Sequence, residues 1–164
     1  MPTLRPLDPA ADRAAVDTFF RSIADYVRLE RDEEPGPQVT EEYFSDAPPG
    51  CDPADSHRIG LFHDGRLMAL AEMAQGYPGP QDAYLGFLAV SQAGRGQGLG
   101  LHLLRHMEDL ARKGGHTTLY LAVLDANPRA RAFWELEGFT LAAANRPVTL
   151  GRKTQVAHRL SKPL

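Results

Sequence analysis

The stretch LAVSQAGRGQGLGLHLL, Leu88–Leu104, decides the fold, because it joins an apolar run to a helical pattern through a glycine-rich segment. Upstream, AYLGFLAV (83–90) is apolar on both alternating faces, as a strand in the centre of a sheet is. Downstream, leucine and methionine recur at helical spacing over residues 99–110, until Gly114 and Gly115. The order strand, glycine turn, helix predicts an anion site, since the unpaired N–H groups at a helix start attract phosphate.

The spacing of the glycines in this segment indicates which kind of phosphate group it could bind. Three of them alternate with other residues and leave the backbone bare, and they are Gly96, Gly98 and Gly100. The triphosphate-binding loop needs a lysine that is absent between Arg95 and Lys113. The dinucleotide fingerprint needs a third glycine where Leu99 or Leu101 stands. The spacing therefore excludes a nucleotide-dependent kinase or dehydrogenase. It favours a pyrophosphate cradle to which Arg95 adds charge, and the alternative is a turn that binds nothing.

The rest of the chain alternates strand and helix patterns and predicts a mixed α/β sheet. The expected strands are 3–7, 57–62, 66–74, 83–90, 117–124, 139–144 and 154–160. The expected helices are one from Asp8 as N-cap to about Leu29, a short one over 40–44, and those over 99–113 and 127–138. We expect one domain over residues 1–164, since this length suits a single core.

Composition excludes several classes of function. Hydrophobic residues make up 43% and charged residues 24%, which is typical of a globular chain. The net charge of −3 gives no basic footprint for nucleic acid. The single Cys51 cannot form an internal disulfide, and no His, Cys and carboxylate show metal-ligand spacing, so no metal is expected. No signal peptide or long apolar segment is present, so we expect a soluble, intracellular, cytoplasmic protein without a membrane partner.

Two motifs carry a resemblance to a known family. The segment Arg95–Gly100 resembles the (Q/R)-x-x-G-x-(G/A) motif of the GCN5-related N-acetyltransferases, the GNAT family. NPRARAFWELEGF (127–139) is similar to the family's N-x-x-A-x-x-F-Y-x-x-x-G-F segment. The resemblance covers nearly the whole chain and is strongest over 83–140. It implies a mixed, mostly antiparallel twisted sheet of six to seven strands, flanked by about four helices.

The resemblance also implies acetyl-coenzyme A as cosubstrate. Main-chain groups of Leu88 and Val90, on either side of Ala89, would hold the pantetheine amides, and Asn127 would bond the cofactor arm. The pyrophosphate cradle would be formed by Arg95, Gly96, Gln97, Gly98, Leu99, Gly100 and Leu101. Arg129 or Arg131 would meet the 3′-phosphate, although arginines on a helix face are more often simply solvated.

The sequence departs from the family's motif at Trp134, where the family usually has a tyrosine that protonates the departing thiolate. An indole N–H is a hydrogen-bond donor only, so Trp134 can bond the sulfur but cannot protonate it. A thiol with a pKa of about 8.5 still leaves tolerably as thiolate at neutral pH. Because a lost general acid typically costs about 10²–10⁴-fold, an enzyme remains the first interpretation.

Transfer to an amine also requires a base, because the ammonium group must lose its proton before it attacks the thioester. Glu72 is the best candidate, a carboxylate within the otherwise apolar LMALAEMA (67–74); the alternative is a solvent-facing strand residue. Tyr84, on the next strand, is a candidate to orient water or substrate, or else packs in the core. The resemblance implies that the Val90 N–H polarises the acetyl carbonyl.

The acceptor and the assembly are less constrained by the sequence. The segment LERDEEPGPQVTEEYF (29–44) carries six acidic residues against Arg31, which favours a cationic amine over an acidic amino acid; the alternative is a solvated loop. The acceptor is a small molecule or a peptide. The alternative function is a catalytically silent acyl-coenzyme A sensor or interaction module, which Trp134 favours. A homodimer is common among families of this fold, and the residues leave the oligomeric state open.

Overall fold

The computed structural model describes residues 1–164 and contains seven strands and five helices, which confirms the predicted fold class. The strands are β1 (Thr3–Pro6), β2 (His57–His63), β3 (Arg66–Gln75), β4 (Asp82–Val90), β5 (Thr118–Leu124), β6 (Thr140–Leu150) and β7 (Lys153–Pro163). The helices are α1 (Arg13–Ser22), α2 (Ala24–Arg31), α3 (Pro37–Ser45), α4 (Leu99–Lys113) and α5 (Pro128–Leu136).

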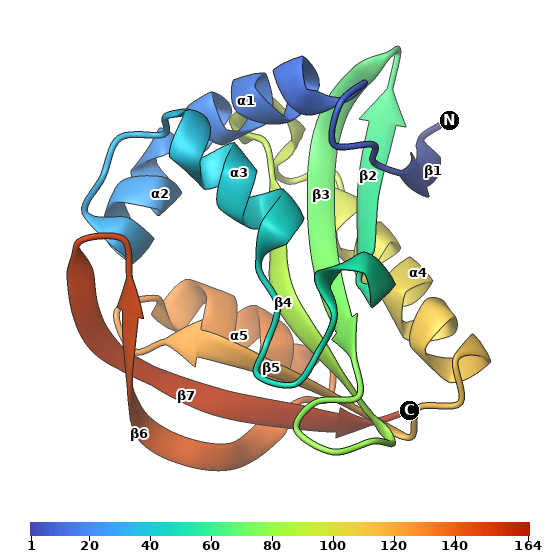
Figure 1. Ribbon diagram of the computed structural model, residues 1–164, viewed down its shortest axis with the longest axis vertical. Coiled ribbons are helices and arrows are strands. Elements are labelled where there is room, and N and C mark those ends of the chain that lie inside the picture. Colours follow the sequence, from blue (N-terminus) through green and yellow to red (C-terminus); the bar gives the residue numbers. More distant parts are fainter.

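All seven strands form one sheet in the order β1-β2-β3-β4-β5-β7-β6 (Figure 1). Every neighbouring pair is antiparallel except β4 and β5, which run parallel. The parallel pairing is short and ends at Leu85 opposite Leu121. Beyond this point the second halves of β4 and β5 have no ladder bonds to each other, so backbone groups of both strands are left for another partner.

Two apolar clusters cover the two faces of the sheet, as the alternation of side chains along a strand requires. In β3, Ala69 and Met73 belong to the cluster that includes α4 and α5, whereas Leu70 belongs to the cluster of α1, α2 and α3. Helices on both faces bury most of β3 and, in β4, Ala83 and Leu85, whereas residues 86–90 are partly buried or exposed. Apolar residues on both faces of β4 therefore do not mean that the whole strand is buried.

The first helical region differs from the prediction of one helix over residues 8–29. The regular helix begins at Arg13, and Asp8 instead closes the preceding turn, where its carboxylate accepts from Ala10 N and Ala11 N. The region is also broken at Ile23, which ends α1 and precedes α2. Further along, α3 begins at Pro37 rather than at residue 40, and β6 extends to Leu150 rather than residue 144.

The β6–β7 hairpin reaches back to the end of α2 (Figure 1). Lys153 Nζ and Gln155 Nε2 donate to Leu29 O at 3.2 and 3.1 Å, and Arg152 N donates to Arg31 O at 3.0 Å. The last carbonyls of a helix have no partner within the helix, so these bonds satisfy them. The hairpin and α2 are thereby fixed to each other on one side of β4.

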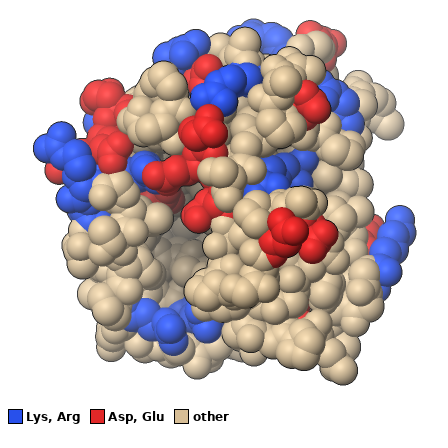
Figure 2. Space-filling model, in the orientation of Figure 1, with Lys and Arg blue, Asp and Glu red and all other residues tan.

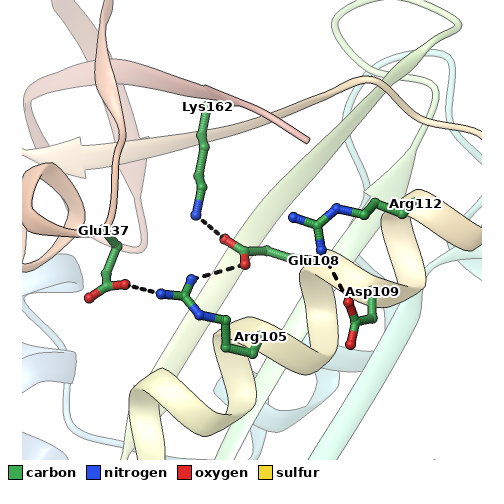
Figure 3. Close-up of polar contacts among 6 residues, drawn as sticks. All are labelled: Arg105, Glu108, Asp109, Arg112, Glu137 and Lys162. Carbon is green, nitrogen blue, oxygen red and sulfur yellow. Dashed lines mark hydrogen bonds and ion pairs between the residues drawn. The ribbon is translucent and has the colours of Figure 1, made fainter.

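The buried carboxylate of Glu108 links α4 to β7, and its partner Arg105 links α4 to Glu137, the residue after α5 (Figure 3). Glu108 is 1% exposed and accepts from Lys162 Nζ at 2.6 Å and from Arg105 Nη1 at 3.0 Å. Arg105 also pairs with Glu137. Asp109 and Arg112, on the exposed side of the same helix, form a separate pair at 3.1 Å.

None of the helices combines the length and the hydropathy that a crossing of the bilayer demands.

Candidate functional site

A cavity of about 890 Å³ lies where β4 and β5 diverge. Its walls come from α2, the segment after α3, the outer halves of β4 and β5, the glycine segment, α5 and β6. Figure 2 shows the molecule hollowed between the β6–β7 hairpin and the segment after α3. Acidic side chains gather on the α2 and α3 side of this hollow and basic ones over β6 and β7 (Figure 2).

Most of the residues singled out in the sequence line this one cavity. They are Glu72, Tyr84, Leu88, Ala89, Val90, Arg95, Gly96, Gly100, Asn127, Arg129 and Trp134. Four others do not line it, namely Gln97, Gly98, Leu99 and Leu101. Gln97 Nε2 donates to Ala93 O at 3.1 Å, Leu99 packs on the core, and the Leu101 side chain is exposed. The part these four take is therefore limited to their backbone.

The glycine segment forms one end of the cavity and fits a pyrophosphate group. Gly96 and Gly98 have φ of 79° and 74°, a left-handed conformation that favours glycine. Gly98 is the N-cap of the 15-residue helix α4 and makes no side-chain cap bond, so the first amides of the helix stay free. An added Cβ at Gly96 or Gly98 would meet nothing within 4 Å, so the space before the helix is open.

Arg95 lies beside this open space and is held by a neighbouring helix. Its guanidinium contacts the Asp25 carboxylate of α2 at 3.4 Å, and both side chains are largely exposed. An exposed pair of this kind is weak and exchanges readily. Arg95 therefore remains available to an anion bound at the start of α4.

The backbone of β4 offers hydrogen-bonding groups to the cavity. Ser91 N donates to Met68 O at 2.8 Å, which makes these two residues a hydrogen-bonded pair with β3. In an antiparallel ladder such pairs alternate with non-bonded ones. Val90 and Leu88 therefore direct their N–H and C=O groups away from β3, toward the side where β5 no longer pairs.

Helix α5 closes the cavity on the far side of β5. Asn127 is its N-cap, and its Oδ1 accepts from Ala130 N at 3.1 Å, which leaves the side-chain NH₂ free to donate into the cavity. Trp134 is 8% exposed and packs edge-on against Phe133 and Phe139, with ring centroids 4.9 and 5.6 Å away. Its indole is thus a rigid wall of the site. Arg129 lines the cavity and forms no ion pair.

Glu72 provides a buried carboxylate at the opposite end. The residue is 9% exposed, on the face of β3 covered by α3, and its Oε1 is buried without a hydrogen-bond partner. Burial raises the pKa of Glu72 from its usual 4.5 to about 7, against the smaller lowering effects of Ser56 and Arg58. A carboxylate with this pKa is half ionised near neutral pH, which suits a proton acceptor.

Gly86 explains how Glu72 reaches the cavity. The ladder between β3 and β4 is bulged next to Glu72, where Glu72 opposes Phe87 and Met73 opposes Leu85, so Gly86 is the extra residue. A Cβ at Gly86 would overlap the Glu72 carboxylate. The absence of a side chain at this position gives the carboxylate its place beside β4.

Two tyrosines form a further wall, and an arginine packs against their rings without lining the cavity. Tyr84 of β4 and Tyr77 both line the cavity, and their rings pack edge-on with centroids 5.2 Å apart. Arg159 of β7 lies over both rings, 5.4 Å from that of Tyr77 and 5.7 Å from that of Tyr84, and its Nη2 donates to Tyr77 Oη at 3.1 Å. Burial raises the pKa of Tyr84, so its hydroxyl stays protonated at neutral pH.

The acidic segment is mostly engaged elsewhere. Glu42 and Glu33 lie at Arg31, and Glu34 pairs with Arg28 at 2.6 Å. Of the six acidic residues in this segment only Glu30 lines the cavity, where it joins Asp25 of the same helix, Asp46 from the segment after α3, and Glu72 of β3. The acidic lining of the cavity therefore comes from three separate segments, namely α2, the segment after α3, and β3.

Several lining residues have no signal in the sequence. Tyr26 packs on Phe87 across the cavity wall, with centroids 5.9 Å apart, and Tyr77 and Asp46 enter from loops. The spacing of apolar residues in the sequence predicts which face of a helix or strand a residue occupies. It does not predict that these residues lie together, because that depends on the order of the strands in the sheet.

Comparison with known proteins gives a consistent result. A sequence model described as the Acetyltransferase (GNAT) family matches residues 22–139. No curated protein matches the sequence.

Solved structures resemble the chain over nearly its full length. An acetyltransferase from Thermus thermophilus is 23% identical, with a TM-score of 0.80 over 100% of this chain and 97% of that one. The ribosomal-protein-S18-alanine N-acetyltransferase from Escherichia coli is 25% identical, with a TM-score of 0.71 over 99% and 94%. The PaiA N-acetyltransferase from Thermoplasma acidophilum, solved in complex with coenzyme A, is 16% identical, with a TM-score of 0.75 over 100% and 99%.

Proposed function

Because the chain belongs to the GNAT family of acetyltransferases, we propose that it transfers an acetyl group directly from acetyl-coenzyme A to a primary amine. The observation that carries this proposal is a single cavity with an anion-binding helix start at one end and a buried carboxylate of raised pKa at the other. The coenzyme A complex of the Thermoplasma relative supports the choice of cosubstrate.

Residues of three elements would hold acetyl-coenzyme A. The free amides at the start of α4, with Arg95, suit the pyrophosphate, and the unpaired backbone of Leu88 and Val90 suits the pantetheine amides. The NH₂ of Asn127 is free for the same arm, and Arg129 for the 3′-phosphate. The thioester then lies between the diverging ends of β4 and β5, where the Val90 N–H is a donor for the carbonyl oxygen.

Glu72 would accept the proton of the incoming ammonium, directly or through a water. The neutral amine forms the bond to the acetyl carbon, the carbon–sulfur bond breaks, and coenzyme A leaves as thiolate. The nitrogen then loses its second proton to the departed thiolate or to water, which gives the neutral amide. Trp134 stands on the cavity wall and cannot supply a proton, but a thiol pKa of about 8.5 makes the thiolate a tolerable leaving group. Tyr84 keeps its proton and is a donor for water or substrate.

A thermal melt tests the binding half of this proposal. Acetyl-coenzyme A at about 100 times Kd should add about 2.7 kcal/mol to the free energy of unfolding. For a chain of this size that raises Tm by about 5–10 °C. ATP and NAD are the controls, and an equal rise with either would contradict a dedicated coenzyme A site. Release of free thiol on addition of amines then separates an enzyme from a silent acyl-coenzyme A sensor.

The place of Gly86 gives a second prediction. In Gly86→Ala the new methyl group displaces the Glu72 carboxylate, the end of a flexible side chain, so the fold should persist. A shift of about 1 Å in a catalytic group costs up to about 10²-fold, so we expect kcat to fall by about that factor. Thiol release measures it, with Tm as the check on folding.

The matched control for Gly86→Ala is the double variant with Glu72→Gln. If the methyl group acts through Glu72, it slows the Glu72→Gln background little or not at all. A full additional loss in the double variant would mean that Gly86 acts on something other than the carboxylate.

A further inference from the structure

Arg58 of β2 lies directly across the sheet ladder from Glu72. The two residues are partners in the antiparallel pairing of β2 with β3, so their side chains are on the same face of the sheet. Residues directly opposite each other in such a ladder have Cβ atoms about 4.5–5.5 Å apart. Arg58 does not line the cavity, so it can act on the reaction only through its neighbours.

The guanidinium of Arg58 is fixed by three main-chain carbonyls. Its Nε donates to Tyr43 O at 2.8 Å, its Nη1 to Pro53 O at 2.7 Å and its Nη2 to Asp46 O at 3.1 Å. Tyr43 is in the last turn of α3, where the carbonyls have no partner within the helix. None of the three acceptors is a carboxylate, so the positive charge is held in place without being neutralised.

The same bonds hold the segment after α3, residues 46–53, as a wall of the cavity. They join both ends of this segment to β2, and residues 46–49 line the cavity. Helix α3 has anchors of its own, since Tyr43 Oη donates to Ala71 O at 2.7 Å and Thr40 bonds to Asp17. A variant of Arg58 should therefore keep α3 over Glu72.

Arg58 is the cation among the groups that face Glu72. Burial has the largest effect on the pKa of Glu72 and raises it; Ser56 and Arg58 act to lower it, and Asp46 raises it further. The Tyr43 hydroxyl is neutral at pH 7, because burial raises its pKa well above the usual value.

The remaining neighbours of Glu72 carry no charge. In β4, Gly86 and Phe87 are next to it, and α1 turns apolar residues to this face of the sheet. The positive charge that favours an ionised Glu72 thus comes from one side chain on the adjacent strand.

We propose that Arg58 is the positioning residue for Glu72: it fixes the cavity wall beside the carboxylate and places a positive charge opposite it. This proposal rests on the proposed role of Glu72 in acetyl transfer. A nearby opposite charge favours the ionised carboxylate, which is the form that accepts a proton. Arg58 therefore keeps a buried carboxylate usable near neutral pH.

Arg58→Gln removes the charge and keeps a side chain that can donate to one carbonyl. An opposite charge close by typically lowers a carboxyl pKa by about 1–3 units, and we expect the low end because Glu72 Oε1 has no hydrogen-bond partner. The bend in the pH profile of kcat/KM should then move from about pH 7 to about pH 8. At pH 7 kcat/KM falls about fivefold, and it recovers at about pH 9.

Two further variants separate charge from structure. Arg58→Lys keeps the charge and should keep the bend near pH 7, even where the lost bonds lower Tm. Arg66→Gln, at the exposed start of β3, changes the net charge equally and should leave the bend unmoved. Arg66 is about 20 Å from Glu72 along the strand, beyond the Debye length of about 10 Å at 0.1 M salt.

Carbon-13 NMR titration of the Glu72 carboxyl group reads the same change without any reaction, and its signal is assigned by its absence in Glu72→Gln. A midpoint that stays near pH 7 or falls in Arg58→Gln would overturn the proposal, and so would an equal rise in Arg58→Lys. Absence of thiol release with every amine would instead overturn acetyl transfer, and the NMR midpoints would still decide whether Arg58 acts on Glu72.

Discussion

Glu72→Gln should lower kcat for acetyl transfer by about 10²–10⁴-fold, the range that a positioned general base contributes. Glutamine keeps the size of the side chain beside Gly86 but cannot accept a proton. The proposed site for acetyl-coenzyme A is at the other end of the cavity, so the effect of this ligand on Tm should be retained. Thiol release with a saturating amine measures the loss, and the retained Tm rise is the internal control.

The proposed role of Glu72 also predicts how kcat/KM depends on pH. The pKa of Glu72 is about 7, so kcat/KM should rise about tenfold per pH unit below 7 and level off above it. In Glu72→Gln this rise of kcat/KM with pH below 7 should be absent. A profile that keeps its bend near pH 7 in the variant would assign the proton to another group.

As pH rises, the free energy of unfolding should fall while activity rises. The carboxyl pKa is about 7 folded against 4.5 for the ordinary group, so the folded state binds the proton more tightly than the unfolded one. The free energy of unfolding therefore falls as pH rises from 4.5 through 7. Glu72→Gln should remove this loss and be more stable above pH 7, on the order of 3 kcal/mol. Urea unfolding at pH 5 and pH 8 measures the difference.

Glu108→Gln should destabilise the fold more than the exchanges at Glu72 or Gly86. Glu108 is 1% exposed and neutralises Lys162, which is 16% exposed, and Arg105 (Figure 3). Removing one member of a buried ion pair typically costs about 3–5 kcal/mol. We expect about 3 kcal/mol, the low end of that range, because Arg105 keeps its pair with a second glutamate and is half exposed.

For a chain of this length that loss corresponds to a fall in Tm of about 6–12 °C. The matched control lies one residue away on α4: Asp109→Asn breaks the exposed pair with Arg112 and should cost less than about 1 kcal/mol. Thermal melts without ligand compare the two. Similar small losses in both would show that Glu108 is compensated by water rather than by its partners.

The elements near the glycine segment were predictable because strong local signals mark them. The helix over 99–113 agrees with the structure at both ends, where the alternating glycines start it and Gly114 ends it. The break at Ile23 left no signal, since Val16, Phe20, Ile23 and Val27 all pack into one cluster and keep a helical spacing across the break. Burial pattern alone does not distinguish one helix from two that bury the same face.

The cofactor end of the site follows from sequence more readily than the acceptor end. Its residues are contiguous, or lie at fixed offsets around a helix start. The acceptor end joins Glu72, Tyr77 and Tyr84, whose proximity depends on the pairing of β3 with β4 and on the bulge at Gly86. The sequence likewise left undecided whether Glu72 faces solvent or the cavity, because its burial depends on α3 covering this face of β3.

The position of β7 between β5 and β6 has a consequence for the order in which the protein assembles. As the chain emerges during synthesis, β5 and β6 are present before the strand that separates them, so the sheet cannot reach its final order from the N-terminus alone. The hairpin bonds to α2 join residues 124 to 126 positions apart. The cavity wall is therefore completed among the last steps of folding, and contacts so distant in sequence favour slow folding.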